Sequence, residues 1–152
     1  MTFPGNFIIR VYGIVINNNC EILISDEFQM GLKMTKFPGG GLEYGEGTIE
    51  GLKREFREEC NGQTIEDIQH FYTTDFFQKA LFHENKQLLS IYYLTRLSGP
   101  VKFKISENPF DFIEEKNGNQ SFRWIKIKSI NVGEFTFPID KFVASKLKKQ
   151  FS

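Results

Sequence analysis

The chain has 152 residues, 40% of them hydrophobic, so it is long enough for one globular domain with a substantial core and short for two. Its 19 basic and 19 acidic residues balance, which gives no electrostatic reason to expect a nucleic-acid polymer or an anionic membrane as partner. Two cysteines are too few for a disulfide framework, and no apolar run reaches the roughly 18 residues that span a bilayer.

These features predict a soluble protein with a single domain over residues 1–152. The N-terminus lacks the basic-then-apolar form of a signal peptide, so the predicted location is the reducing cytoplasm.

The first third of the chain is predicted to form strands. Residues 7–16 are rich in Ile, Val and aromatic side chains, which is typical of a strand buried on both faces. Three asparagines then predict a turn, and residues 21–25 return as the second strand of a hairpin. Residues 26–33 are predicted to be a surface connection, and residues 34–37 a short extended segment that leads into a glycine-rich loop.

Residues 48–60 are predicted to form an amphipathic helix. Thr48 is a suitable N-cap, and Glu50 suits the positive end of the helix dipole. At about 100° per residue, one arc of the helix is apolar and the adjacent arc is acidic. We therefore expect the first arc to pack and the second to be presented: Ile49, Leu52, Phe56 and Cys60 on one side, and Glu55, Glu58 and Glu59 on the other.

Three local features of this helix oppose its stability. Like-charged neighbours cost roughly 0.2–0.5 kcal/mol per pair. Glu58 and Glu59 lie in the last turn, where the dipole disfavours anions by ~0.3–1 kcal/mol each, and Gly51 costs ~1 kcal/mol relative to alanine. A divalent cation and a bulky anion approaching this face would account for all three, because hard cations take carboxylate oxygens and glycine permits close approach.

Mg²⁺ is the metal that these residues favour, with Mn²⁺ as a substitute. It binds through a few carboxylates, keeps some of its waters and lets substrate phosphates complete its octahedron. The stretch lacks the spaced Asp and Asn ligands of a calcium loop, and no cluster of His and Cys suits zinc.

The rest of the chain is predicted to add strands and a terminal helix. Residues 65–77 predict one long or two broken strands, residues 87–97 a central strand and residues 122–127 a further strand. Residues 137–150 predict a helix that ends in lysines. Its expected packing stripe is Ile139, Phe142, Val143 and Leu147, and the polar residues 101–120 between strands offer Phe110, Phe112 and Ile113 as anchors.

Residues 40–62 resemble the Nudix box, G-x5-E-x7-R-E-U-x-E-E-x-G-U, in which U is an apolar residue. Asn61 and Gly62 depart from the pattern, but asparagine tolerates left-handed backbone angles, so the helix can still end there. The resemblance implies an α/β fold, a Nudix-type α/β/α sandwich around a central mixed β-sheet, with a loop-helix-loop metal site. The residues that match in register are Gly40, Glu46, Arg54, Glu55, Phe56, Glu58 and Glu59.

The resemblance also implies a chemistry. The family hydrolyses nucleoside diphosphates linked to another moiety, by attack of water on phosphorus with Mg²⁺ as cofactor; a metal neutralises the diphosphate and a carboxylate orients or deprotonates the water. The implied partner is a small nucleotide-type diphosphate, and because the family is often dimeric a homodimer stays open. The implied metal ligands are Glu55, Glu58, Glu59 and the carbonyl of Gly40.

The other residues of the loop and helix carry supporting roles by the same resemblance. Arg54 completes the catalytic set by holding Glu55 in a salt bridge, and Glu46 stabilises the loop or a metal-bound water. The general base stays open between Glu55, Glu59 and a carboxylate outside the box. The glycines assigned to the loop and substrate are Gly39, Gly41 and Gly51, and the outside carboxylates are Glu107, Glu114 and Glu115.

The substrate is not predicted beyond this class. Residues 75–80 carry none of the markers that some Nudix subclasses have beyond the box. The alternative function is a Nudix-fold nucleotide-binding or regulatory module without turnover; such proteins usually lose box glutamates, and here they are all present. The aromatic side chains that offer base stacking are Phe76, Phe77, Tyr92 and Tyr93.

Overall fold

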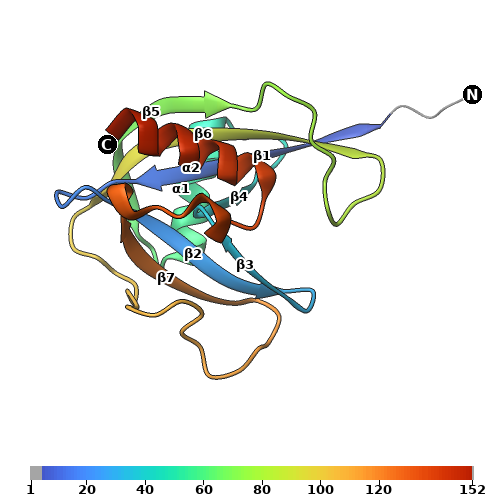
Figure 1. The fold of residues 1–152 in the computed structure, drawn as a ribbon. Coiled ribbons are helices and arrows are strands. Elements are labelled where there is room, and N and C mark those ends of the chain that lie inside the picture. Colours follow the sequence, from blue (N-terminus) through green and yellow to red (C-terminus); the bar gives the residue numbers. More distant parts are fainter. Residues whose placement is uncertain (1–4, 152) are drawn as a thin grey trace, which may run out of the picture.

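The computed structural model describes residues 5–151, and Figure 1 shows the resulting ribbon. In chain order the elements are β1 (Asn6–Val15), β2 (Glu21–Gln29), β3 (Leu32–Lys36), β4 (Gly39–Gly41), α1 (Thr48–Glu59), β5 (Thr64–Thr73), β6 (Lys86–Ser98), β7 (Asn119–Lys126), the short 3-10 helices η1 (Ile127–Ser129) and η2 (Val132–Glu134), and α2 (Pro138–Phe151).

The strands form two sheets. The larger one has the order β4-β1-β6-β5, in which β1 and β6 are parallel and the other pairs antiparallel, so it is a mixed sheet. The smaller one is antiparallel, with the order β3-β2-β7. The predicted hairpin of β1 and β2 is therefore wrong beyond its turn: only Ile16 and Ile22 form a bridge, after which the two strands enter different sheets.

The helices cover opposite faces of the mixed sheet (Figure 1). The alternation of side chains along β1 explains why: Tyr12 and Ile14 pack in the cluster that contains α2, whereas Val11 and Val15 pack in the cluster that contains α1. This arrangement confirms the predicted α/β sandwich around a mixed sheet. The second sheet was not predicted.

Gly13 lets α1 approach the sheet closely. A Cβ atom built on this residue would lie 2.7 Å from the ring of Phe56, the largest apolar side chain of α1. Phe56 and Leu52 are fully buried, as predicted. Ile49 is 40% exposed, and on α2 the side chain of Phe142 is 45% exposed, so both apolar stripes are narrower than expected.

The region predicted as a surface connection is so only in its second half: residues 30–33 are exposed, whereas residues 26–29 belong to β2, the central strand of the smaller sheet. β2 continues to Gln29 and β3 begins at Leu32, which leaves only two residues between them. The prediction failed at Asp26, a charged residue that suggested a surface position. Asp26 is fully buried, and its charge is satisfied because Arg123 donates to it at 2.7 Å and Thr35 at 2.8 Å. A charged residue in a sequence predicts a surface position, and the buried position of Asp26 follows only from its partner Arg123, which is 97 positions away.

Two further expectations are corrected. The strand β1 is buried on both faces only in its second half, and Phe7 is 66% exposed. In the long loop between β6 and β7, Ile113 is fully exposed, and the residues that pack against the core are Phe103 and Ile105. Within residues 5–151, no helix has the length and apolar character needed to cross a membrane.

Replacing Asp26 with asparagine should destabilise the fold by about 3–5 kcal/mol, because it leaves the buried guanidinium of Arg123 without its main counter-charge. The loss is measurable as a lower urea midpoint with unchanged slope. The matched control is Glu115→Gln, which breaks an ion pair to Lys33 whose side chains are 51% and 58% exposed, and should cost less than about 1 kcal/mol. Equal effects of the two substitutions would contradict the role assigned to Asp26.

Candidate active site

The glycine-rich strand β4 leads through residues 42–47 into α1. The helix begins with Gly47 as N-cap, and the backbone N–H of this glycine donates to the side chain of Glu50 at 3.2 Å. Thr48, predicted as the cap, is the first helical residue, and its hydroxyl is instead 2.6 Å from that of Tyr93 on β6. This contact ties the start of the helix to the mixed sheet.

Arg54 joins the loop to the helix. Its guanidinium donates to both carboxylate oxygens of Glu46, at 2.7 and 3.0 Å, and to the carbonyl of Gly41 at 2.9 Å. One further nitrogen donates to Glu55 at 3.1 Å and to Glu58 at 3.2 Å. The hydrogen bonds from Arg54 lower the pKa of Glu46 to about 2, so Glu46 is ionised at any physiological pH.

Glu55 lies beneath Gly40. A Cβ atom on Gly40 would come within 2.6–2.7 Å of all three atoms of the Glu55 carboxyl group, so only glycine lets this carboxylate lie against the loop. Glu55 is 9% exposed, which corrects the expectation that it is fully presented on the acidic arc. Glu58 does extend outward, with a side chain that is 59% exposed.

The other glycines serve the packing of the loop. A Cβ on Gly51 would collide with Leu42 and with Glu46, at 2.6 and 2.9 Å, so this helical glycine lets the loop lie on the helix rather than opening a path for an anion. Gly39 has a φ of 147°, and a Cβ there would lie 2.1 Å from the carbonyl oxygen of Val11. Gly41 has open space around the same position.

Glu59 faces a different set of charges. Burial, the largest cause, raises the pKa of Glu59 to about 7; the charge of Lys36 lowers it, and those of Glu27 and Glu55 raise it further. Glu27 lies on β2, where it accepts from Ser25 at 2.9 Å and lies 3.2 Å from the ammonium of Lys36. The sequence analysis did not identify Glu27 or Lys36 as site residues. For Lys36 there was one indication, because a charged residue directly before the apolar Phe37 suggests a charge held near the core.

A cleft of about 560 Å³ opens beside these residues. Gly40, Glu55 and Glu59 line this cleft. Largely apolar residues line it as well: Leu88, Tyr92, Phe137, Ile139 and residues 80–83. Of the four aromatic side chains considered for base stacking, only Tyr92 lines the cleft, and it is 1% exposed.

Asp140 on α2 also lines the cleft, where burial raises its pKa while the charges of Lys36 and Arg10 lower it. It is 2% exposed, and one oxygen accepts from the hydroxyl of Tyr92 at 2.5 Å. The other oxygen, Oδ2, is buried and has no hydrogen-bond partner within residues 5–151. Burial raises the pKa of Asp140 to about 6. An unsatisfied buried acceptor on a cleft wall is the kind of group that a ligand N–H would satisfy.

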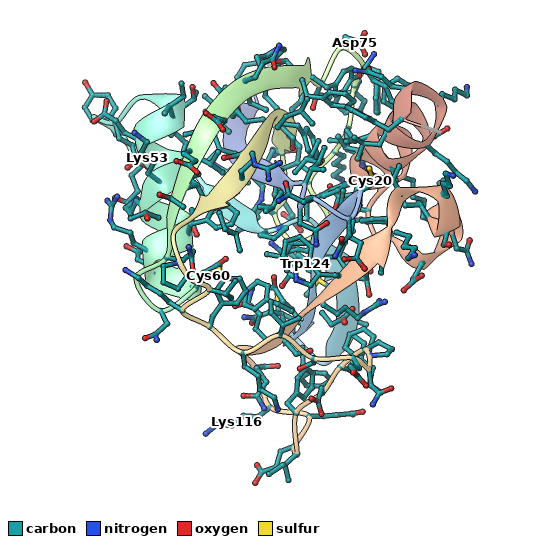
Figure 2. All side chains as sticks on the ribbon, turned by 90° about the vertical axis from the view of Figure 1, so that its left-hand side faces the viewer. Cys20, Lys53, Cys60, Asp75, Lys116 and Trp124 are labelled. Carbon is teal, nitrogen blue, oxygen red and sulfur yellow. The ribbon has the colours of Figure 1, made fainter. Side chains whose placement is uncertain are left out.

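The carboxylates considered outside the box do not reach this cleft. Glu107, Glu114 and Glu115 are exposed on the loop between β6 and β7 and do not line it. Figure 2 shows Lys116, the neighbour of Glu115, at the outer end of that loop, well away from Lys53 and Cys60 on and after α1. Cys60 is fully buried, and burial raises the pKa of its thiol to about 12, so it is not a nucleophile.

A model of the NUDIX domain matches residues 7–145. The chain belongs to the Nudix family. The predicted resemblance is confirmed, and the coarse expectation of a Nudix hydrolase fold holds over nearly the whole chain. No curated protein matches the sequence.

Solved structures of Nudix proteins share the fold. The MutT proteins of the fish pathogen Aliivibrio salmonicida and of Vibrio cholerae are the subject of one, with 24% identity, coverage of 95% of this chain and 99% of the other, and a TM-score of 0.67. A NUDIX hydrolase from Nitrosomonas europaea has 16% identity, coverage of 97% and 90%, and a TM-score of 0.65. A MutT protein from Methanosarcina mazei has 19% identity, coverage of 98% of both chains, and a TM-score of 0.63.

The end of the Nudix box keeps its geometry despite the two departures from the family pattern. Asn61 and Gly62 have φ values of 52° and 80°, both in the left-handed region that ends a helix. The N–H of Gly62 donates to the carbonyl of Arg57 at 2.8 Å and satisfies one of the last carbonyls of α1.

The acidic groups of this Nudix box fit a magnesium ion by their chemistry. Within residues 5–151, no three side chains converge as a complete metal cage, since Glu58 turns to Arg54 while Glu59 faces Glu27 and Lys36. Mg²⁺ does not need such a cage, because it takes one or two carboxylates and keeps several waters. The two neighbouring carboxylates that raise the pKa of buried Glu59 make a site that a divalent cation would stabilise.

Proposed function

We propose that the chain is a Mg²⁺-dependent Nudix hydrolase that cleaves the diphosphate bond of a nucleoside diphosphate derivative. The observation that carries this proposal is one cleft that is lined both by Glu55 and Glu59, the first of which lies against Gly40, and by largely apolar residues. Its volume of about 560 Å³ is in the range of small-molecule sites and suits a nucleotide.

The bound metal would neutralise charge on the diphosphate and activate water for attack on phosphorus. Residues of this chain would hold it: Glu55, which lies against Gly40, and Glu59 line the cleft, and Glu58 would have to leave Arg54 to join them. Arg54 orients Glu55 through their 3.1 Å contact. Of the two base candidates in the box, Glu59 fits better, because it lines the cleft and has no contact with Arg54, whereas Glu55 is held by Arg54.

The apolar lining of the cleft would hold the nucleoside. Leu88, Phe137 and Ile139 supply an apolar surface, and Oδ2 of Asp140 supplies a buried acceptor that has no hydrogen-bond partner within residues 5–151. A base that presents N–H groups would satisfy this acceptor, so Asp140 favours amino-bearing bases. The related structures described as MutT proteins and NUDIX hydrolases support the reaction class and not the choice of substrate.

The second candidate is a nucleotide-binding module without turnover. The observation that favours it is the double contact of Arg54 with Glu55 and Glu58, which occupies two of the three proposed ligands.

A substrate screen tests the two functions. Wild-type protein is assayed with Mg²⁺ or Mn²⁺ against nucleotide sugars, ADP-ribose, dinucleoside polyphosphates and (d)NTPs, beside Glu58→Gln. We expect turnover of at least one class, with a loss of about 10²–10³ in kcat in the variant, since a metal ligand contributes several kcal/mol. Tight binding of one compound without turnover in the wild type would favour the module.

A further inference from the structure

Two cations lie around one aromatic ring in the wall of the cleft. Arg10 is on β1, opposite Gly41 of β4 in the register of the mixed sheet, and Lys36 is the last residue of β3. The guanidinium carbon of Arg10 is 5.5 Å, and the ammonium of Lys36 is 5.3 Å, from the centre of the Tyr12 ring. Both cations line the cleft beside Gly39–Gly41.

The hydrogen bonds of Arg10 are far from complete. Its Nε donates to the hydroxyl of Tyr12, and within residues 5–151 the two terminal nitrogens have no hydrogen-bond acceptor and no carboxylate partner. The other half-buried or buried arginines of the site and core differ in this respect, because Arg54 and Arg123 each bind at least two carboxylates. The open fork of Arg10 is therefore available to a ligand.

Lys36 has one donor left as well. Its ammonium lies 3.2 Å from Glu27 and donates to the carbonyl of Gly39 at 3.3 Å, which accounts for two of its three N–H groups. It is 5% exposed. Burial lowers the pKa of Lys36, but the charges of Glu27 and Tyr12 outweigh this effect, and the net shift is upward, so the group is cationic at neutral pH.

Neighbouring groups compensate this pair of cations only in part. Burial lowers the pKa of each cation, and Arg10 lowers that of Lys36, which shows their mutual repulsion. Tyr12, Glu27 and Glu55 keep the net shift of Arg10 upward, but no carboxylate within residues 5–151 pairs with its terminal nitrogens. An anion between the two cations would offset their repulsion, and a planar fork beside a point charge matches the oxygens of a phosphate.

We propose that Arg10 and Lys36 bind a phosphate group of the substrate directly, without a metal, in the cleft that Glu55 and Glu59 also line. This inference deepens the proposed function, since it assigns the second set of contacts to the same diphosphate. The acidic residues and the two cations would then hold adjacent phosphates, which selects ligands with at least two linked phosphates over a nucleoside monophosphate.

Binding of inorganic pyrophosphate in EDTA, followed by calorimetry, tests the proposal apart from metal and turnover. The wild type should bind pyrophosphate with an affinity that falls with added salt, and Arg10→Gln or Lys36→Gln should weaken it by roughly 10- to 100-fold. The matched control is Arg96→Gln, which removes one positive charge from β6 outside the cleft and should leave the affinity within about threefold. Equal affinity of wild type and Arg10→Gln, or no binding by the wild type, overturns the proposal.

The same proteins separate this inference from the proposed function. If a substrate is turned over and Arg10→Gln leaves its KM unchanged, the phosphate contact is wrong and the hydrolase holds. If nothing is turned over but pyrophosphate binding in EDTA still depends on Arg10, the contact holds and the hydrolase is wrong. Arg10→Lys keeps the charge and loses the fork, and it covers the case in which Arg10→Gln does not fold. Its affinity for pyrophosphate should be lower than that of wild type and Arg96→Gln and higher than that of Lys36→Gln.

Discussion

Glu59→Gln is expected to lower kcat by about 10²–10³ while raising the stability of the metal-free protein. The loss of activity follows because the amide neither carries the charge that attracts Mg²⁺ nor accepts a proton from water. The gain in stability follows because burial and the neighbouring Glu27 and Glu55 disfavour the ionised form of Glu59, whose pKa is raised to about 7. At pH 8 in EDTA, we expect the free energy of unfolding to rise by about 2–3 kcal/mol.

The pH dependence of this gain has a definite sign. A carboxyl group whose pKa is raised on folding holds its proton more tightly in the folded state. Its contribution favours folding below the ordinary value of 4.5 and is lost as the pH rises through about 7. The difference between wild type and Glu59→Gln should therefore be small at pH 4 and largest above pH 7, and Mg²⁺ should reduce it by stabilising only the wild type.

Urea titrations at several pH values measure the stability, and initial rates on the best substrate of the screen measure kcat. Glu107→Gln is the control: it removes an exposed carboxylate on the long loop, outside the cleft, and both readouts should stay near those of the wild type. If Glu59→Gln were less stable than the wild type at pH 8, the attraction between Glu59 and Lys36 would outweigh burial and the repulsion from Glu27 and Glu55, and the prediction would be wrong.

Gly40→Ala should reduce kcat by about 10² with a small change in stability. The added methyl would lie 2.6–2.7 Å from the carboxyl group of Glu55, which is the mobile end of a side chain, so the fold can absorb the contact by moving that group. The movement displaces the carboxylate from its position beneath the loop and away from its 3.1 Å contact with Arg54. A displacement of about 1 Å is enough for a loss of this size.

Gly41→Ala is the matched comparison in the same strand, because a Cβ there meets nothing within 4 Å. We expect its kcat to be at least about tenfold higher than that of Gly40→Ala, since Glu55 stays in place. Thermal unfolding should show that both variants are folded. Equal loss in the two variants would mean that the loop itself, rather than the position of Glu55, limits the reaction.

Local patterns were sufficient for most elements of the fold. The apolar runs of β1, β6 and β7, the amphipathic helices and the helix end at Asn61 all follow from periodicity and turn residues. The arrangement of α1 and its loop was predicted from the resemblance to the Nudix box. The wrong predictions share a physical cause: they concern residues whose environment is decided by a distant partner, such as Asp26 with Arg123, or Ile16, where β1 and β2 part into two sheets.

The candidate site was predictable in its acidic half and not in the rest. The box spacing identified Arg54, Glu55, Glu58 and Glu59, because all lie on one helix. Arg10, Glu27 and Asp140 come from β1, β2 and α2, and only the folded sheet brings them to one cleft. Gly51 was assigned to substrate approach, but its role depends on where residues 42–46 lie, which a linear pattern does not contain.

Arg54 has a consequence for how the protein matures. The single positive charge of Arg54 offsets part of the negative charge of Glu46, Glu55 and Glu58, so the acidic face contains an internal cation without any metal. If the proposed Mg²⁺ site is correct, we expect the chain to fold without the ion, unlike small zinc domains, which stay unfolded until loaded.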